Sequence, residues 1–283
     1  MSPRLVIHIG DPKTGTSSIQ RVLMDGAWQA PGLTMMPRAQ LNDYPLANTL
    51  RKAKQRAKLE PRFTALARQI AASEADLAVV SAEQFWGVDP KALYEALRRF
   101  LPEHAESARV IAYVRPHAAH FLSGYAQSCK TGHFQGDGAA YLAHVQTGRI
   151  LNCAPRFLAW RDTFGDRFTL RLFDRARLSG GDAVRDFLET ATGRTDIEIT
   201  AGAAQNETLT RPALAGVMLL QQRLDAAGIP QEVKTALGGE MAGLCNRGGG
   251  MGGEKLALDR ALATRIAARF AEDAAALDAA FFP

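Results

Sequence analysis

The sequence has no apolar run close to the roughly 20 residues that a membrane-spanning helix requires, and it has only three cysteines. Cys129, Cys153 and Cys245 lie far apart and match neither a disulfide framework nor the spacing of a metal site. We therefore expect thiols in a reducing compartment. The apolar stretch 5–9 leads directly into a loop, which is not the pattern of a signal peptide. These absences predict a cytoplasmic protein without a transmembrane segment.

Aromatic residues are also scarce, at 7% of the chain, and they are not interleaved with the basic residues. No nucleic-acid recognition motif is present, so nucleic acid is a poor candidate partner. The formal net charge of +5 instead favours small anionic ligands. The basic run 51–58 could bind an acidic glycan or an anionic lipid head, but a solvated helix face is the favoured interpretation. No pattern indicates the oligomeric state.

Four short apolar runs have the composition of buried strands and are separated by helical patterns, which predicts right-handed βαβ crossovers. These runs are residues 5–9, 77–81, 109–114 and 168–173. Asp89-Pro90 predicts the start of a helix through Phe100, and a last helix is expected through Leu258, Leu262, Ile266 and Phe270. The expected fold class is α/β, a three-layer P-loop-like fold with a central, mostly parallel sheet flanked by helices.

Length and pattern predict a single domain, 1–283, on which some segments look like insertions. The main ones lie at about 28–75 and 128–155, the second opening with the Gly-rich stretch 128–138. Residues 246–253 hold five glycines in eight positions and predict a flexible loop. Because ligands of open α/β sheets bind beyond the C-terminal ends of the strands, such loops are expected near a binding site.

The first strand is followed by a phosphate-binding pattern that lacks one usual residue. Gly10 and Gly15 are five positions apart, as in the loop GxxxxGK[ST], but Thr16 stands where a nucleotide kinase has its lysine. The lysine is at Lys13, inside the loop. Backbone N–H groups, the helix start and the hydroxyls of 14–17 still suit an oxyanion. The structural alternative is a helix start capped by Thr16 or Ser17.

A second anion-binding pattern follows the strand 109–114. Arg115 stands at the C-terminal end of that strand, where its guanidinium is well placed to bind a phosphate through two hydrogen bonds. Ser123 follows eight residues later in a predicted helix and can add a hydrogen bond. Each residue alone is weak evidence for a phosphate site. Together with the phosphate-binding loop earlier in the sequence, the pair indicates a second site for an anion.

With both patterns present, the chain resembles sulfotransferases that use 3′-phosphoadenosine 5′-phosphosulfate (PAPS), in the style of bacterial and carbohydrate-type members. The family loop reads P-K-[ST]-G-[TS]-[TS] after the first strand, and residues 12–17 match it throughout. The family's second motif is an Arg at a strand end with Ser eight residues on, matched by Arg115, Ser123 and the following Tyr125. Pro116 falls one place earlier than in the common form.

The resemblance implies roles for these residues. Lys13, Thr14, Gly15, Thr16 and Ser17 would bind the 5′-phosphosulfate, with Lys13 stabilising the charge that develops on the bridging oxygen. Arg115 and Ser123 would hold the 3′-phosphate. A late Gly-rich basic loop often contacts the nucleotide in this family, which makes Arg247 a further candidate, although a linker before the last helix explains segment 246–253 equally well.

A general base is needed to take the proton of the acceptor. Glu83 follows the strand 77–81 at the expected active-site edge and is the first candidate, with helix capping or pairing with an arginine as the structural alternative. His133 in the Gly-rich loop is the second candidate. His8, within the first strand, is better explained as a core or near-site histidine.

These observations predict sulfonate transfer from PAPS to a hydroxyl or amine of a small-molecule, lipid or carbohydrate acceptor. No metal is expected, because sulfonate carries less charge than a γ-phosphoryl group and Ser81-Ala82-Glu83 places no aspartate directly on the strand to hold Mg²⁺. One alternative is a P-loop nucleotide-dependent kinase. The other is a non-catalytic protein that binds PAPS or its product, adenosine 3′,5′-bisphosphate (PAP).

Overall fold

The computed structural model describes residues 2–145, 150–200, 209–247 and 253–282. The chain divides into two compact units, the first made of Met1–Arg115 with Ala154–Ala204 and the second of Pro116–Cys153 with Gln205–Pro283. The expectation of one domain with insertions stays a prediction.

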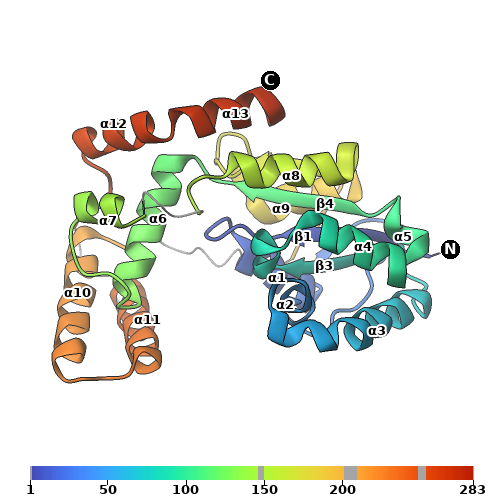
Figure 1. The fold of residues 1–283 in the computed structure, drawn as a ribbon, viewed down its shortest axis with the longest axis horizontal. Coiled ribbons are helices and arrows are strands. Elements are labelled where there is room, and N and C mark those ends of the chain that lie inside the picture. Colours follow the sequence, from blue (N-terminus) through green and yellow to red (C-terminus); the bar gives the residue numbers. More distant parts are fainter. Residues whose placement is uncertain (1, 146–149, 201–208, 248–252, 283) are drawn as a thin grey trace. The chain divides into compact units, whose positions relative to one another are not determined.

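The first unit contains a four-stranded parallel sheet in the order β3-β1-β4-β5 (Figure 1). Its strands are β1 (Arg4–Ile9), β3 (Leu77–Ala82), β4 (Arg109–Val114) and β5 (Phe168–Leu172). Every predicted strand boundary lies within one residue of the observed one. The runs were recognisable because strands of a parallel sheet are covered on both faces and are therefore almost continuously apolar. The α/β prediction with a central parallel sheet is confirmed.

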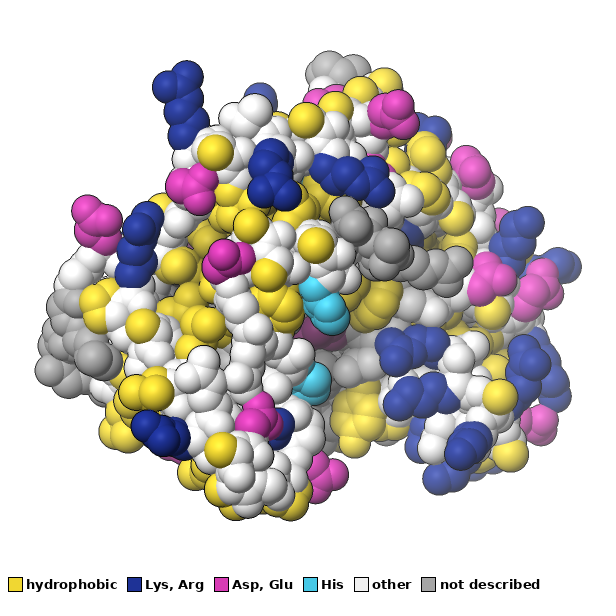
Figure 2. Space-filling model, turned by 60° about the vertical axis from the view of Figure 1, so that its left-hand side comes forward, with side chains coloured by type: hydrophobic (Ala, Val, Ile, Leu, Met, Phe, Trp, Pro, Cys, Tyr) yellow, Lys and Arg dark blue, Asp and Glu magenta, His cyan; other side chains and the backbone are white. Residues whose placement is uncertain are grey.

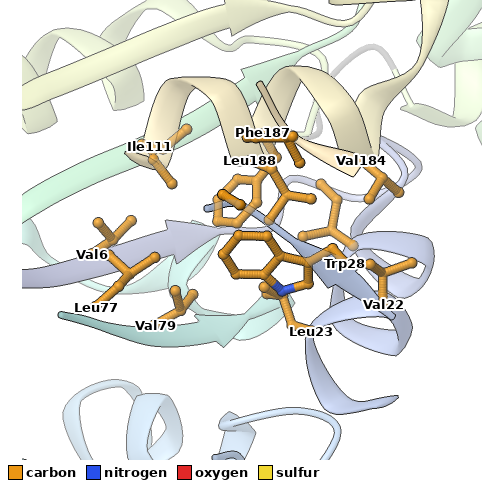
Figure 3. Close-up of a cluster of buried hydrophobic side chains, with 14 of the residues drawn as sticks. Val6, Val22, Leu23, Trp28, Leu77, Val79, Ile111, Val184, Phe187 and Leu188 are labelled. Carbon is orange, nitrogen blue, oxygen red and sulfur yellow. The ribbon is translucent and has the colours of Figure 1, made fainter. Parts of the chain in front are cut away.

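One face of this sheet is covered by α1 (Thr16–Asp25) and α9 (Ala183–Thr192). Figure 3 shows Trp28 at the centre of the cluster, with Val6 and Ile111 from the sheet and Phe187 from α9 around it. Trp28 belongs to β2 (Trp28–Gln29), which pairs antiparallel with β6 (Glu198–Ile199). This small second sheet belongs to the same cluster, because Trp28 is buried in it and Ile199 packs against it.

The opposite face is covered by helices of the same unit, and α8 (Ala154–Phe164) lies against β5. The rings of Phe157 and Trp160 lie 6.3 and 6.4 Å from that of Phe168. Phe168 pairs with Val110 and so points away from the neighbouring Ile111 and its cluster. Helix α4 (Pro90–Phe100) packs against α8, and its cap is the predicted one, because the Asp89 carboxylate accepts a 3.0 Å bond from Lys91 N–H. The unit therefore has the expected three layers.

The predicted insertion 28–75 covers the outer edge of the sheet and then forms helices. Met36 N–H donates to Leu77 O at 2.8 Å, and Asp43 N–H donates to Ser81 O at 2.9 Å, so β3 is not an open edge. The segment continues through α2 (Tyr44–Arg51), a 3₁₀ helix η1 (Ala53–Lys58) and α3 (Leu59–Ala71).

The second unit is helical in its described part. Its helices are α6 (His117–Lys130), α7 (Gly138–Val145), α10 (Arg211–Ala226), α11 (Gln231–Arg247), α12 (Arg260–Arg269) and α13 (Ala271–Phe281). Phe121, Val217 and Ile266 lie in its buried cluster. The three cysteines of the chain are buried thiols, as expected. None of the helices in the described ranges has the length and apolar character needed to cross a bilayer.

Three expectations about helix ends were wrong. The helix through Leu262 and Ile266 is not the last, since α13 begins directly after Phe270. Helix α6 continues through Lys130, so the polar loop after it is shorter than expected. Helix α11 runs to Arg247 and takes up the first two residues of the predicted glycine loop. Residues 248–252 of that loop lie outside the described residues.

Candidate active site

The loop between β1 and α1 has the backbone form of an anion-binding turn. Gly15 precedes α1 in the left-handed conformation with φ 76°, and Lys13 has φ 68°, the one positive φ outside glycine in the described ranges. A left-handed lysine costs about 1–2 kcal/mol. Thr14 Oγ1 donates to the carbonyl oxygen of Asp11 at 2.6 Å and so helps to offset that cost. Lys13 is exposed, whereas Thr14 is buried beneath the loop.

Helix α1 begins without a side-chain cap from any described residue, which removes the alternative of a start capped by Thr16 or Ser17. The first N–H groups of an uncapped helix need a ligand or water. The Thr16 hydroxyl is buried and has no hydrogen-bond partner in the described part of the chain. A buried hydroxyl beside uncapped N–H groups fits an oxyanion such as the phosphate of a phosphosulfate.

Gly10 brings the loop into close contact with the end of β3. A Cβ atom at Gly10 would lie 2.6 Å from Thr16 Oγ1 and 2.8 Å from Glu83 Cα, distances that real Cβ atoms do not show. Gly10 N–H also donates to Ala82 O at 3.2 Å. The absent side chain therefore lets the start of α1 and the residue after β3 meet at the C-terminal edge of the sheet.

Glu83 is placed beside the loop by this contact. It opens the 3₁₀ helix η2 (Glu83–Gly87) and is half-buried. It makes no capping bond, and across the described ranges no arginine pairs with it, so neither structural alternative for Glu83 is observed. Burial raises the pKa of Glu83, and the positive charge of Lys13 acts against that rise. A carboxylate with a raised pKa near a lysine has the character of a proton acceptor.

Asp11 and Arg156 form an ion pair at the base of the loop that the sequence reasoning did not find. Arg156 Nη2 on α8 lies 2.7 Å from Asp11 Oδ1, and the Asp11 side chain has no exposed surface. Burial raises the pKa of Asp11 to about 7, against the effect of Arg156 and with a further contribution from Glu83. The Arg156 guanidinium carbon also lies 5.5 Å from the centre of the Trp86 ring. No local pattern pairs these residues, which are 145 positions apart.

Arg115 lies directly after β4, as predicted, with its guanidinium carbon 4.7 Å from the centre of the Phe173 ring. Phe173 also lies against the loop, because a Cβ atom at Gly15 would be 2.9 Å from Phe173 Cε2. Burial lowers the pKa of Arg115. In the part of the chain that the structure describes, no carboxylate pairs with Arg115. A half-buried arginine without a carboxylate partner fits recognition of an added anion.

The remaining predicted site residues belong to the second unit, and their roles stay predictions. Ser123 is half-buried in α6. His133 is exposed after α6, and its Nδ1 lies 2.9 Å from Thr131 Oγ1. Arg247 is the final residue of α11 rather than a loop residue. Tyr125, which the family pattern also matches, donates its hydroxyl to Gly136 O at 2.9 Å.

His8 lies in the core, in agreement with its interpretation from the sequence. Its Nδ1 is 2.8 Å from Ser81 Oγ, and its ring lies 4.8 Å from that of Phe187. Burial, assisted by the charge of Arg38, lowers the pKa of His8 to about 3. A histidine with so low a pKa stays neutral at ordinary pH and supports the sheet.

A second buried polar cluster occurs within the helical unit. The potential ligand atoms of His117, Cys153 and Asp273 lie within 4.8 Å of one another. Asp273 Oδ2 is 2.8 Å from His117 Nε2 and accepts from Cys153 N–H at 3.0 Å. These hydrogen bonds account for the arrangement as a buried polar group.

Similarity to known proteins was found among solved structures and not among protein families or curated sequences. No protein-family model and no curated protein matches the chain. Among solved structures, the chain is similar to a sulfotransferase from Alicyclobacillus acidocaldarius, with a TM-score of 0.49 and 13% identity, over 99% of this chain and 95% of that one. The function proposed below rests on the residues of the loop and its surroundings and not on this likeness.

Proposed function

We propose that this protein is a sulfotransferase that moves the sulfonate group of PAPS to a hydroxyl or amine of an acceptor in the cytoplasm. The observation that carries the proposal is the meeting of three features at one sheet edge. They are a phosphate-type loop with its lysine at Lys13, an uncapped helix start at Thr16 and a carboxylate at Glu83. The class of acceptor remains a small molecule, a lipid or a carbohydrate.

The loop residues fit the 5′ end of the donor. The N–H groups at the start of α1 and the buried Thr16 hydroxyl would donate to the phosphate oxygens, and Ser17, which is exposed, would add a further hydroxyl. Lys13 would lie at the oxygen that bridges phosphorus and sulfur. Its ammonium group would stabilise the negative charge that this oxygen gains as the bond to sulfur breaks.

Proton transfer completes the reaction. The acceptor oxygen or nitrogen forms a bond to sulfur while the bond from sulfur to the bridging oxygen breaks, and PAP leaves. Glu83 takes the proton of the acceptor, which removes the positive charge that the attacking oxygen or nitrogen would otherwise carry. His133 is the second candidate for this step. At the other end of the nucleotide, we assign the 3′-phosphate to Arg115 and Ser123, with Arg247 as a further candidate contact.

Ligand-dependent thermal stability tests the donor assignment. PAP should stabilise the protein by about 3 kcal/mol at a hundredfold excess over its dissociation constant, and Mg-ATP should have little effect. Lys13→Ala should weaken stabilisation by PAP, whereas Lys91→Ala, which removes an exposed lysine from α4, should not. Stronger stabilisation by Mg-ATP than by PAP would instead identify a kinase and refute the proposal.

Turnover separates an enzyme from a binding protein. PAPS labelled with ³⁵S should lose its label to an acceptor, and Glu83→Gln should slow that transfer while PAP still binds. Full retention of PAP binding without transfer to any class of acceptor would indicate a non-catalytic binding protein.

A further inference from the structure

A row of uncompensated cations lies on the surface of the first unit. Arg51, Lys52, Lys54, Arg56 and Lys58, called here the basic strip, are all exposed and fall within eight residues at the end of α2 and along η1. Across the described ranges, no carboxylate forms an ion pair with any of them. On the face drawn in Figure 2, lysine and arginine side chains gather at the lower right instead of being spread evenly.

The strip is joined to the candidate active site through η2. The Arg51 guanidinium carbon lies 5.9 Å from the centre of the Trp86 ring, and a Cβ atom at Gly87 would lie 3.1 Å from Arg51 Cδ. Trp86 is in the same 3₁₀ helix as Glu83 and also lies 5.5 Å from Arg156. The Trp86 ring therefore lies between Arg51, at the start of the strip, and Arg156, which pairs with Asp11 at the base of the loop that is proposed to bind the donor.

The residues in and around the basic strip limit the kinds of ligand that it could bind. Insertion of an amphipathic helix into a membrane would need large apolar side chains, but the exposed apolar residues of η1 are only Ala53 and Ala57. A peptide that adds a strand would need the edge of β3, which Asp43 N–H and its neighbours already cover. A six-residue 3₁₀ helix extends about 12 Å. The cations of η1 are spread over this length, so they suit a ligand that carries several negative charges at intervals along a chain.

We propose that the basic strip binds an acidic polysaccharide and presents it to Glu83 as the acceptor. The inference rests on the proposed function for its final step, because a bound polysaccharide is an acceptor only if the neighbouring site transfers sulfonate. In this arrangement the cations of η1 hold the carboxylates of the sugar chain, and Arg51 beside Trp86 holds the unit nearest to the active site. A hydroxyl of that unit is the group that Glu83 deprotonates.

Binding is measured on the full chain with polygalacturonate, a polymer of uronic acids, and with neutral dextran at equal mass. The strip variant is Lys54→Gln/Arg56→Gln/Lys58→Gln. The control is Arg21→Gln/Arg68→Gln/Lys91→Gln, which removes the same charge from exposed sites on three other helices. We expect polygalacturonate but not dextran to bind, with affinity lowered on the order of tenfold in the strip variant and little changed in the control. Added salt should weaken the binding.

Three results would overturn the inference. Equal losses in the two variants would show attraction by net charge alone. Tighter strip-dependent binding of phosphatidylserine vesicles would identify a membrane surface, and tighter binding of polyglutamate would identify an acidic peptide. Stabilisation by PAP must persist in the strip variant. A wild-type protein that binds polygalacturonate through the strip but is not stabilised by PAP would refute the proposed function and leave the polysaccharide site in place.

Discussion

Gly10→Ala adds one methyl group at the point where the loop meets the end of β3. The new Cβ atom would lie 2.6 Å from Thr16 Cγ2 and Oγ1 and 2.8 Å from Glu83 Cα. Thr16 is buried, so its branched side chain has little room to turn away, and the Glu83 backbone is held nearby by the bond from Gly10 N–H to Ala82 O. The start of α1 and the end of β3 must therefore move apart. Overpacking of this kind costs about 1–3 kcal/mol, which corresponds to a fall in Tm of roughly 2–10 °C.

The assay compares Tm with and without PAP for the wild type, Gly10→Ala and Gly239→Ala. Gly239 lies in α11 and has open space around its Cβ position, so its alanine variant should be neutral or slightly stabilising. Gly10→Ala should lower Tm and also lose most of the stabilisation by PAP, because the uncapped N–H groups no longer converge on one phosphate. If Gly10→Ala kept both the wild-type Tm and the full response to PAP, the close contact between loop and Glu83 would be wrong.

Three further predictions follow from buried or crowded groups. Glu83→Gln should lower the rate of labelled sulfonate transfer by at least about a hundredfold, and wild-type turnover should fall with acidification through the raised pKa of Glu83, because the base must be ionised. Asp11 has a native pKa of about 7 against an ordinary 3.8, so its contribution to stability is present at low pH and is lost as pH rises toward 7. Asp11→Asn should flatten the dependence of the free energy of unfolding on pH in this range, as measured by urea unfolding. An unchanged dependence would contradict the raised pKa of Asp11. Gly238→Ala should destabilise the helical unit strongly in thermal melts, because its Cβ atom would lie 1.9 Å from Lys130 O, whereas equal melts for Gly238→Ala and Gly239→Ala would refute the packing.

The sheet and the loop could be predicted because their signals are local. Buried parallel strands are short continuous apolar runs, and Asp89-Pro90 combines a cap with the residue that best starts a helix. The position of Lys13 between two glycines indicated a phosphate loop without any knowledge of its surroundings. The left-handed backbone of Lys13 was known only from the structure, because lysine has no preference for a positive φ that the sequence could reveal.

The missed features depend on contacts between distant residues or on weak periodicity. The pair of Asp11 and Arg156 exists because α8 packs on β5 and turns its first residues toward the loop. Helix α13 was overlooked because its sequence, AEDAAALDAAF, is rich in alanine and has no clear apolar stripe. Glu83 could be placed at the correct sheet edge from the sequence, but its contact with Gly10 required the register of β1 against β3, which pairs Ile9 with Ala82.

The most direct measurement is calorimetric binding of PAP and AMP, which differ by the 3′-phosphate, to the wild type and to Arg115→Ala. Arg109→Ala is the matched control, because Arg109 begins the strand that Arg115 follows and is at the other end of β4. The wild type and the control should bind PAP about ten- to a hundredfold more tightly than AMP, as a hydrogen-bonded charge pair would give. Arg115→Ala should lose most of this preference, because the hydroxyl of Ser123 supplies no positive charge. Equal affinity for PAP and AMP in the wild type, or an unchanged preference in Arg115→Ala, would contradict the assignment of this protein as a PAPS-dependent sulfotransferase.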